Sequence, residues 1–325
     1  MDILISEDFD SSFITALERR YRIVREPGLW KNPKLLKQQI QSARALMVRN
    51  QTQVTREILA AAPGLVAVGR VGVGLDNIDV AAATSLGIVV VAPLEANAVS
   101  VAELTIALML ALARKVPAAD RTTKAGAWDR KGCTGLELNG KTVVICGFGR
   151  IGRLVAKVAR SLGMDIVVFD PFVKAGSPAL TEVGAKSCRK IETALAQADF
   201  VTIHLPLTPG TKRLFNARTF GAMKPGSFFI NTSRGGVVDE AALLRVLKRG
   251  WLAGAALDVR TTEPPGKTAF DGMDNVILTP HIGAFTVEAQ ARTFQAVCQD
   301  LDCLLRDRPA LNYVNLAQPG RSSSD

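Results

Sequence analysis

The chain has 325 residues, of which 48% are hydrophobic and 22% charged, an ordinary globular composition with room for two domains. Its net charge is +10, but Lys and Arg are dispersed among Asp and Glu, without the basic, aromatic-rich tract that favours nucleic-acid binding. Five scattered cysteines without a CxxC pair argue against a disulfide framework and a zinc site, and for a reducing compartment.

Two features argue against a membrane or secreted protein. The first ten residues, "MDILISEDFD", are acidic and lack the basic start of a secretory signal. The longest apolar run, "LTIALMLALA", is too short to cross a bilayer. We therefore expect a cytoplasmic protein that binds neither membrane nor nucleic acid.

The first part of the chain alternates short, β-branched apolar runs with helical patterns. Strands are expected at residues 2–5, 45–49, 65–70 and 88–92, and helices at residues 14–20 and 55–62. A long helix over residues 100–116 follows. Because it is apolar on most of its faces, we expect it to be buried. A loop rich in Gly and charge, residues 126–142, then leads into the next strand.

The second part of the chain keeps the same alternation more regularly. Strands are expected at residues 142–149, 165–170, 199–205, 227–233, 253–259 and 275–281, and helices at 151–163, 191–198, 239–250 and 286–305. Such alternation predicts an α/β protein with two doubly wound parallel-sheet domains. The last helix is expected to return to the first domain, and residues 317–325 are expected to form a disordered tail.

A glycine motif begins the second part. "GFGRIG" places Gly147, Gly149 and Gly152 after a predicted strand and at the start of a helix, with Asp170 about twenty residues further on. In this dinucleotide fingerprint Gly147 permits a tight turn, Gly149 lets the backbone approach a pyrophosphate, and Gly152 lets the helix lie close to the strand. The carboxylate of Asp170 would accept hydrogen bonds from the ribose hydroxyls, and its charge would repel a 2′-phosphate, which favours NAD over NADP. The alternative is a glycine turn and a solvated strand end without a ligand.

A nicotinamide enzyme that oxidises an alcohol also needs a proton acceptor, and histidine is best matched to that task near neutral pH. The chain has two histidines, His204 and His281, and each follows a predicted strand. These observations alone do not choose between them, and a core histidine is the structural alternative for each.

Several stretches resemble the family of D-isomer-specific 2-hydroxyacid dehydrogenases, over nearly the whole chain. They are "VGRVGVGLDNID", "SVAELTIALMLALAR", "LNGKTVVICGFGRIGR", "HLPLT", "INTSRGGVVDE", "AGAALDV", "TTEPP" and "TPHIGA". The resemblance implies a Rossmann-type NAD-binding domain, residues 99–286, and a smaller flavodoxin-like substrate-binding domain, residues 1–98 plus 287–325. Within the family, the chain is most similar to dehydrogenases that act on D-3-phosphoglycerate.

The resemblance implies three catalytic residues, Arg234, Glu263 and His281. His281 would take the hydroxyl proton, Glu263 would orient the imidazole, and Arg234 would hold the substrate carboxylate. It also assigns His204 to the cofactor site rather than to proton transfer. The remaining cofactor-binding positions that it implies are Arg150, Ile151, Thr232, Ser233, Asp258 and Gly283. A loop salt bridge for Arg234 and a solvated acid for Glu263 are the structural alternatives.

The substrate side is expected in the first domain. Arg49 and Arg70 each end a predicted strand, and the loop Gly72, Val73 and Gly74 would offer backbone N–H groups to the substrate carboxylate. Two added arginines suit a substrate with a second anionic group such as a phosphate, although both could instead form surface salt bridges.

The first expectation is therefore oxidation of D-3-phosphoglycerate to 3-phosphohydroxypyruvate with NAD. The segment "PLEANAVS", residues 93–100, departs from the wording usual in the family, which leaves the substrate open. A hydroxypyruvate or glyoxylate reductase and a sulfolactate dehydrogenase are alternatives. An NADH-responsive corepressor is an alternative of a different class. The resemblance also suggests a homodimer, formed near residue 100.

Overall fold

The computed structural model describes residues 1–320, so residues 321–325 of the expected tail lie outside the described residues. The expected disorder of residues 317–320 is wrong, because the carbonyl of Ala317 accepts the N–H of Ala310 and the N–H of Gly320 donates to Gly87, each at 2.9 Å. The chain divides into two compact units. Unit 1 comprises Met1–Asn97 and Ala284–Asp325, and unit 2 comprises Ala98–Gly283. The family resemblance placed the boundaries at residues 98/99 and 286/287.

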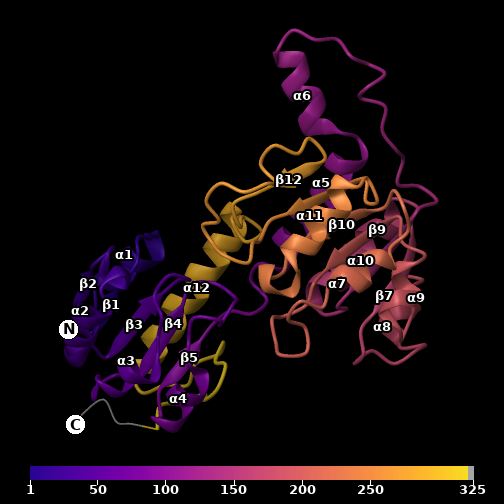
Figure 1. Ribbon diagram of the computed structural model, residues 1–325. Helices are drawn as coiled ribbons and strands as arrows, with labels where there is room; N and C mark the ends of the chain where they lie inside the picture. The colour runs from indigo at the N-terminus through magenta and orange to yellow at the C-terminus, as the bar shows by residue number, and fades with distance from the viewer. Residues whose placement is uncertain (321–325) are drawn as a thin grey trace. The chain divides into compact units, whose positions relative to one another are not determined.

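Unit 1 contains a five-stranded parallel sheet with the order β2-β1-β3-β4-β5 (Figure 1). Its strands are β1 (Ile3–Ile5), β2 (Ile23–Arg25), β3 (Ala45–Val48), β4 (Ala67–Arg70) and β5 (Val89–Val91). This is the flavodoxin-like strand order, and it confirms the predicted fold of this unit.

Helices cover both faces of that sheet. They are α1 (Ser12–Glu18), α2 (Pro33–Gln39), α3 (Arg56–Ala60), α4 (Val80–Ser85) and α12 (Val287–Leu304). The returning helix α12 lies against β4, where a side chain on Gly69 would meet Val297 and Leu301. The missing side chain therefore lets the last helix of the chain pack closely on the sheet.

Unit 2 contains a seven-stranded parallel sheet with the order β12-β11-β10-β9-β6-β7-β8. The strands are β6 (Thr142–Cys146), β7 (Asp165–Phe169), β8 (Lys186–Ser187), β9 (Phe200–Ile203), β10 (Phe228–Asn231), β11 (Gly254–Leu257) and β12 (Val276–Leu278). Numbered within the unit and read from the β8 end, the order is 3-2-1-4-5-6-7, and its first six strands have the order of a Rossmann fold. The order reverses between β6 and β9, and ligands bind at such a point in open parallel sheets.

Both faces of the unit 2 sheet are covered by helices. Val143 and Ile145 of β6 pack with α5 (Ala98–Ala113) and α7 (Arg150–Ser161). Val144 and Cys146 pack on the opposite face with residues of α9 (Ile191–Leu195), α10 (Ala217–Gly221) and α11 (Glu240–Lys248). This explains why the strand is apolar at consecutive positions instead of alternating.

The structure adds elements that the periodicity does not reveal. They are β2, β8, α2, α4, α6 (Val116–Lys124), α8 (Pro178–Glu182) and α10, together with the 3-10 turns Leu29–Lys31, Ile40–Ser42 and Gly235–Val237. The long helix predicted to run to residue 116 ends at Ala113. Lys115 then adopts a left-handed conformation, and α6 begins at Val116. In Figure 1, α6 and the loop after it extend away from the sheet of unit 2.

Candidate functional site in two parts

The glycine loop of unit 2 has the geometry of a phosphate-binding turn. Gly147 has φ +94°, and a side chain there would collide with the carbonyl oxygen of His204. A side chain at Gly152 would collide with the carbonyl oxygen of Gly147, so α7 lies close to β6. At Gly149, by contrast, a Cβ atom would meet no atom within 4 Å. The loop is thus tight where the backbone turns and open where a pyrophosphate would approach.

Asp170 lies where the fingerprint requires it, after β7. Its carboxylate accepts the backbone N–H of Phe148 (2.7 Å) and that of Phe172 (2.9 Å). Phe148 is in the glycine loop, so the acid is fixed beside that loop. Gly149 and Arg150 are exposed at the N-terminus of α7, and the N-cap residue Gly149 has no side chain that could cap the helix. Ile151, which follows, is half-buried. The loop, the helix end and the acid together fit a dinucleotide.

His204 is held near the same loop in a neutral form. Its Nε2 lies 3.0 Å from Thr202 Oγ1, and its Nδ1 is buried without a hydrogen-bond partner among residues 1–320. Burial lowers the pKa of His204 to about 3. A ring with so low a pKa is a poor proton acceptor near neutral pH, so His281 remains the candidate for that role.

His281 and Glu263 form a close pair. His281 Nδ1 lies 2.6 Å from Glu263 Oε2, and the two side chains are 44% and 33% exposed. The other oxygen of Glu263 accepts the backbone N–H of Arg260 at 2.9 Å. Partial burial raises the pKa of Glu263, but the hydrogen bonds from His281 and Arg260 and the charges of His281 and Arg234 bring it below its ordinary value. The carboxylate is therefore ionised at neutral pH. Because it occupies Nδ1, a proton acceptor role for this ring would fall to Nε2.

Asp258 organises the loop that carries His281. This buried carboxylate accepts the Thr279 hydroxyl (2.6 Å) and the N–H groups of Ile282 (2.8 Å) and Gly283 (2.9 Å). The backbone carbonyl oxygen of Asp258 accepts the N–H of His281 at 2.8 Å. His281 has φ +55°, an unfavourable conformation for a residue with a side chain. The bonds to Asp258 hold the backbone in that conformation.

Arg234 lies on the neighbouring loop after β10. Asn231 accepts bonds from the N–H and hydroxyl of Ser233, and its amide donates to the Arg234 carbonyl at 3.0 Å. Buried Thr232 Oγ1 lies 2.9 Å from Thr105 Oγ1 of α5. The Arg234 guanidinium donates to the Ser233 carbonyl at 2.8 Å. Unit 2 therefore contains all three predicted catalytic residues and every predicted cofactor residue.

Unit 1 contains the predicted substrate residues at the carboxyl ends of β3 and β4. Arg49 Nη2 donates to Gln290 Oε1 at 2.7 Å, and its guanidinium lies over the Phe285 ring at 4.4 Å. Burial lowers the pKa of Arg49, opposed by the charge of Glu7. Even a lowered arginine pKa leaves the guanidinium charged at neutral pH.

Arg70 lies over its own glycine loop. Its Nη1 donates to the Val71 carbonyl at 2.9 Å, and a side chain at Gly72, which has φ +146°, would collide with that nitrogen. Val73 and Gly74 continue the loop and are half-buried. The glycine is therefore required for Arg70 to adopt this position.

Some supporting residues are absent from the sequence-based prediction. Buried Glu7 accepts four consecutive backbone N–H groups, from Arg49 to Thr52. Its position after a predicted strand is the signal that could have revealed it. Gln290 follows Arg49 by 241 positions, and no local pattern connects the two. The same holds for the pair formed by Glu240 and Arg260.

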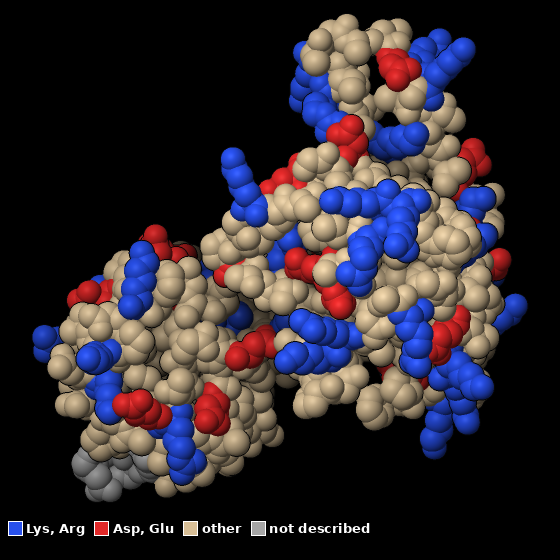
Figure 2. All heavy atoms as spheres, viewed as in Figure 1, with Lys and Arg blue, Asp and Glu red and all other residues tan. Residues whose placement is uncertain are grey.

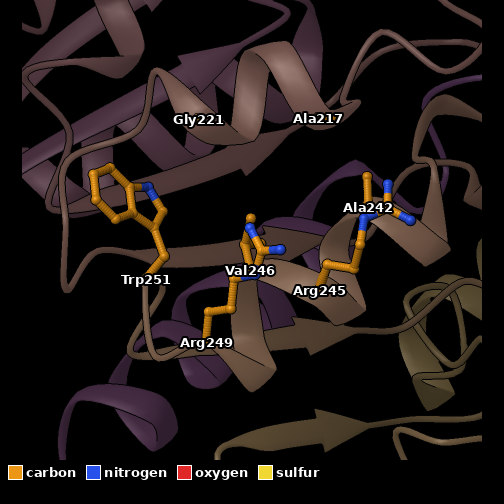
Figure 3. A pocket seen from close by; sticks show the side chains of 7 residues that line it. All are labelled: Ala217, Gly221, Ala242, Arg245, Val246, Arg249 and Trp251. Carbon is orange, nitrogen blue, oxygen red and sulfur yellow. The ribbon is translucent and has the colours of Figure 1, made fainter.

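The surface features lie apart from these residues. A pocket of about 330 Å³ between α10 and α11 is lined by Ala217, Gly221, Ala242, Arg245, Val246, Arg249 and Trp251, none of them a predicted site residue (Figure 3). On the face drawn in Figure 2, Lys and Arg are scattered over each unit with Asp and Glu among them.

Within residues 1–320, no cluster of three or more His, Cys, Asp or Glu side chains could hold a metal ion. In the same part of the chain, every helix is too short or too polar to cross a membrane.

Comparison with known proteins gives a consistent result. The NAD-binding domain of the D-isomer specific 2-hydroxyacid dehydrogenases matches residues 106–283. The chain is 42% identical to D-3-phosphoglycerate dehydrogenase of Methanocaldococcus jannaschii over 97% of this chain and 59% of that protein. It therefore spans less than two thirds of that relative's length.

Two solved structures share the fold over nearly their full lengths. The TT0316 protein of Thermus thermophilus has a TM-score of 0.89 and 33% identity, with 97% of this chain and 100% of that one covered. A glyoxylate reductase from Paecilomyes thermophila has a TM-score of 0.85 and 30% identity, with 97% and 98% covered. From the family match, with the glycine loop and the acid after β7, we conclude that the chain belongs to the D-isomer specific 2-hydroxyacid dehydrogenase family and contains its NAD-binding domain.

Proposed function

We propose that the protein is an NAD-dependent oxidoreductase that interconverts a 2-hydroxy acid and its 2-oxo acid, with D-3-phosphoglycerate as the first candidate substrate. The observation that carries this proposal is the 2.6 Å contact between His281 Nδ1 and Glu263 Oε2, in the unit that also holds the dinucleotide loop. An ionised acid beside one ring nitrogen leaves the other nitrogen to exchange a proton, which is the arrangement that alcohol oxidation needs.

In the proposed mechanism, the residues of unit 2 divide the work. When bound, NAD supplies the acceptor for the hydride from C2 of the substrate. His281 Nε2 accepts the hydroxyl proton, and Glu263 balances the resulting imidazolium. The Arg234 guanidinium holds the substrate carboxylate and polarises the C2 oxygen. In the reverse direction, His281 returns the proton to that oxygen.

We propose that the substrate carries a second anionic group bound by Arg49 and Arg70. The support is that the Arg49 guanidinium bonds to a neutral amide and lies over an aromatic ring, while the nearby Glu7 carboxylate accepts backbone N–H groups instead. A phosphate is the first candidate group and a sulfonate, as in sulfolactate, the second. Hydroxypyruvate or glyoxylate reduction would not need these charges. The proteins similar to this chain include a D-3-phosphoglycerate dehydrogenase, found by sequence, and a glyoxylate reductase, found by structure.

A substrate panel tests both parts of the proposal. The purified protein is assayed with NADH and phosphohydroxypyruvate, sulfopyruvate, hydroxypyruvate or glyoxylate, and NADH oxidation is followed by absorbance. We expect turnover that is fastest with a dianionic substrate. Equal kcat/KM on charged and plain substrates would contradict the role of the arginines. NADH binding without turnover on any 2-oxo acid would contradict the enzyme and favour a corepressor-like interaction protein.

We also propose a homodimer formed through α5, α6 and the loop after α6. Its support is the apolar surface that these segments of unit 2 expose, at Val99, Leu110, Val116, Trp128 and Leu136. Such surface is usually covered by a partner.

We also propose that the protein is located in the cytoplasm. The support is that its five cysteines are free thiols, which are typical of a reducing compartment.

Trp128→Asp tests the dimer by light scattering after size exclusion. Trp128 is 81% exposed, and the change is expected to convert a dimer to a monomer. Leu311→Asp, at an 86% exposed leucine in unit 1, is the matched control and is expected to leave the dimer intact. A monomeric wild-type protein would contradict the proposal.

A further inference from the structure

Arg260 and Glu240 form a buried ion pair near the Glu263 loop. Arg260 Nε and Nη2 donate to the two oxygens of Glu240 at 3.2 and 2.8 Å, a two-point contact between side chains that are 6% and 25% exposed. The guanidinium also lies 4.9 Å from the centre of the Phe270 ring. Burial raises the pKa of Glu240, but the hydrogen bonds from Arg260 and Thr261 bring it below its ordinary value, so the carboxylate is ionised.

This ion pair is connected to the catalytic pair through the backbone. Glu240 Oε1 also accepts the N–H of Thr261 at 2.7 Å, so one carboxylate fixes both the side chain of residue 260 and the backbone of residue 261. The N–H of Arg260 in turn donates to Glu263 Oε1 at 2.9 Å, and Glu263 Oε2 contacts His281. Hydrogen bonds on either side of the Arg260 backbone therefore connect Glu240 to the imidazole.

The same ion pair bridges two catalytic loops. Glu240 is the first residue of α11, which follows the loop of Arg234 through the turn Gly235–Val237. Gly235 packs directly against the Arg260 backbone, because a side chain there would collide with Arg260. The loop of Arg234 and the loop of Glu263 are thus held together at two points, the glycine contact and the ion pair.

We propose that Glu240 and Arg260 are positioning residues, which fix Glu263 relative to Arg234 and so determine the orientation of the His281 imidazole. This inference rests on the proposed catalytic role of Glu263. A buried ion pair contributes little net stability compared with apolar residues of similar size, whereas its directional bonds fix geometry well. A displacement of about 1 Å in a catalytic group can lower a rate about 100-fold.

Two variants remove the pair from either side. Arg260→Met keeps much of the side-chain volume but removes the fork, and Glu240→Gln removes the charge. Each is expected to lower kcat about 10- to 100-fold while the KM for NADH stays within about twofold, because the glycine loop is not touched. Arg260→Lys keeps the charge but not the two-point contact and is expected to recover part of the loss.

Asp199→Asn is the matched control for general destabilisation. Asp199 also accepts a backbone N–H, from Thr142, and pairs with Lys224, in the same unit but away from the catalytic loops. The Asp199→Asn variant is expected to lower the melting temperature as much as Glu240→Gln does, while its kcat stays within about twofold of wild type. If Asp199→Asn lowers kcat as much as Arg260→Met, or if Arg260→Met and Glu240→Gln retain wild-type kcat, the inference is wrong.

A spectroscopic measurement separates this inference from the proposed function. The chain has two histidines, so the ring nitrogen signals of His281 can be assigned by NMR with a His281→Asn variant. In Arg260→Met and Glu240→Gln, the Nδ1 shift is expected to move towards that of Glu263→Gln. An Nδ1 shift unchanged from wild type would overturn the positioning role. This readout holds even if the wild-type protein turns over none of the substrates, or if Arg260→Met does not fold and Glu240→Gln alone is measured.

Discussion

The two units place their charges at the carboxyl ends of their sheets in different ways. In unit 2, His281 contacts the carboxylate of Glu263, and the loops of these two residues are braced by Asp258 and the Glu240–Arg260 pair. In unit 1, Arg49 is held by a neutral amide and an aromatic ring. Groups that exchange protons need a fixed partner, whereas a group that binds an anion must keep its charge available. The difference supports assigning chemistry to unit 2 and substrate recognition to unit 1.

Removing the imidazole of His281 in unit 2 should have the largest effect on turnover. His281→Ala is expected to lower kcat about 1000-fold, because the proposed mechanism assigns the proton transfer to this imidazole. NADH binding, measured by fluorescence titration, is expected to stay within about twofold of wild type. His204→Asn is the comparison variant, and it should alter NADH affinity more than kcat. Unchanged turnover in His281→Ala would mean that another group is the base.

Removing a guanidinium from unit 1 should affect recognition and leave the chemistry intact. Arg49→Leu is expected to raise the KM for phosphohydroxypyruvate about 10- to 100-fold, equivalent to roughly 1.5–3 kcal/mol for a hydrogen bond to a charged group. With glyoxylate, kcat/KM should change less than about threefold. Arg25→Leu is the matched control, because Arg25 also ends a strand of unit 1 but pairs with Asp10 and Glu18. Equal losses on both substrates would contradict the division between the units.

The smallest effect is on the pH dependence of stability, and it distinguishes the two histidines of unit 2. The pKa of His204 is about 3 in the folded chain and about 6.5 in the unfolded chain, so below pH 6.5 the unfolded state binds the extra proton. Stability is therefore expected to fall by about 1–2 kcal/mol between pH 7 and pH 5. Urea unfolding of His204→Asn should show this loss reduced, whereas exposed His281, replaced by Asn, should leave it in place. Equal slopes in wild type and His204→Asn would contradict the buried, neutral state of His204.

Much of the unit 2 fold and of its site could be predicted because the signals are local. Gly147, Gly149, Gly152 and Asp170 are close in sequence, and strand–helix alternation fixes the handedness of their connections. Short elements such as β2 and β8 were not predicted, since two or three residues carry too little periodicity to be distinguished from a loop.

The resemblance of its motifs to a known family supplied the identity of the candidate catalytic residues. The sequence alone determined the two parallel-sheet architecture and the dinucleotide loop. It did so because backbone conformation and apolar periodicity are set by neighbouring residues. Tertiary structure decided which histidine has a buried ring nitrogen and a low pKa, and it placed the Glu263 carboxylate against the other histidine, His281. It also paired Glu240 with Arg260, and Arg49 with Gln290 across 241 positions. Such pairings form because the order of strands in the sheet brings distant segments together at the strand ends. No local pattern in the sequence encodes that order.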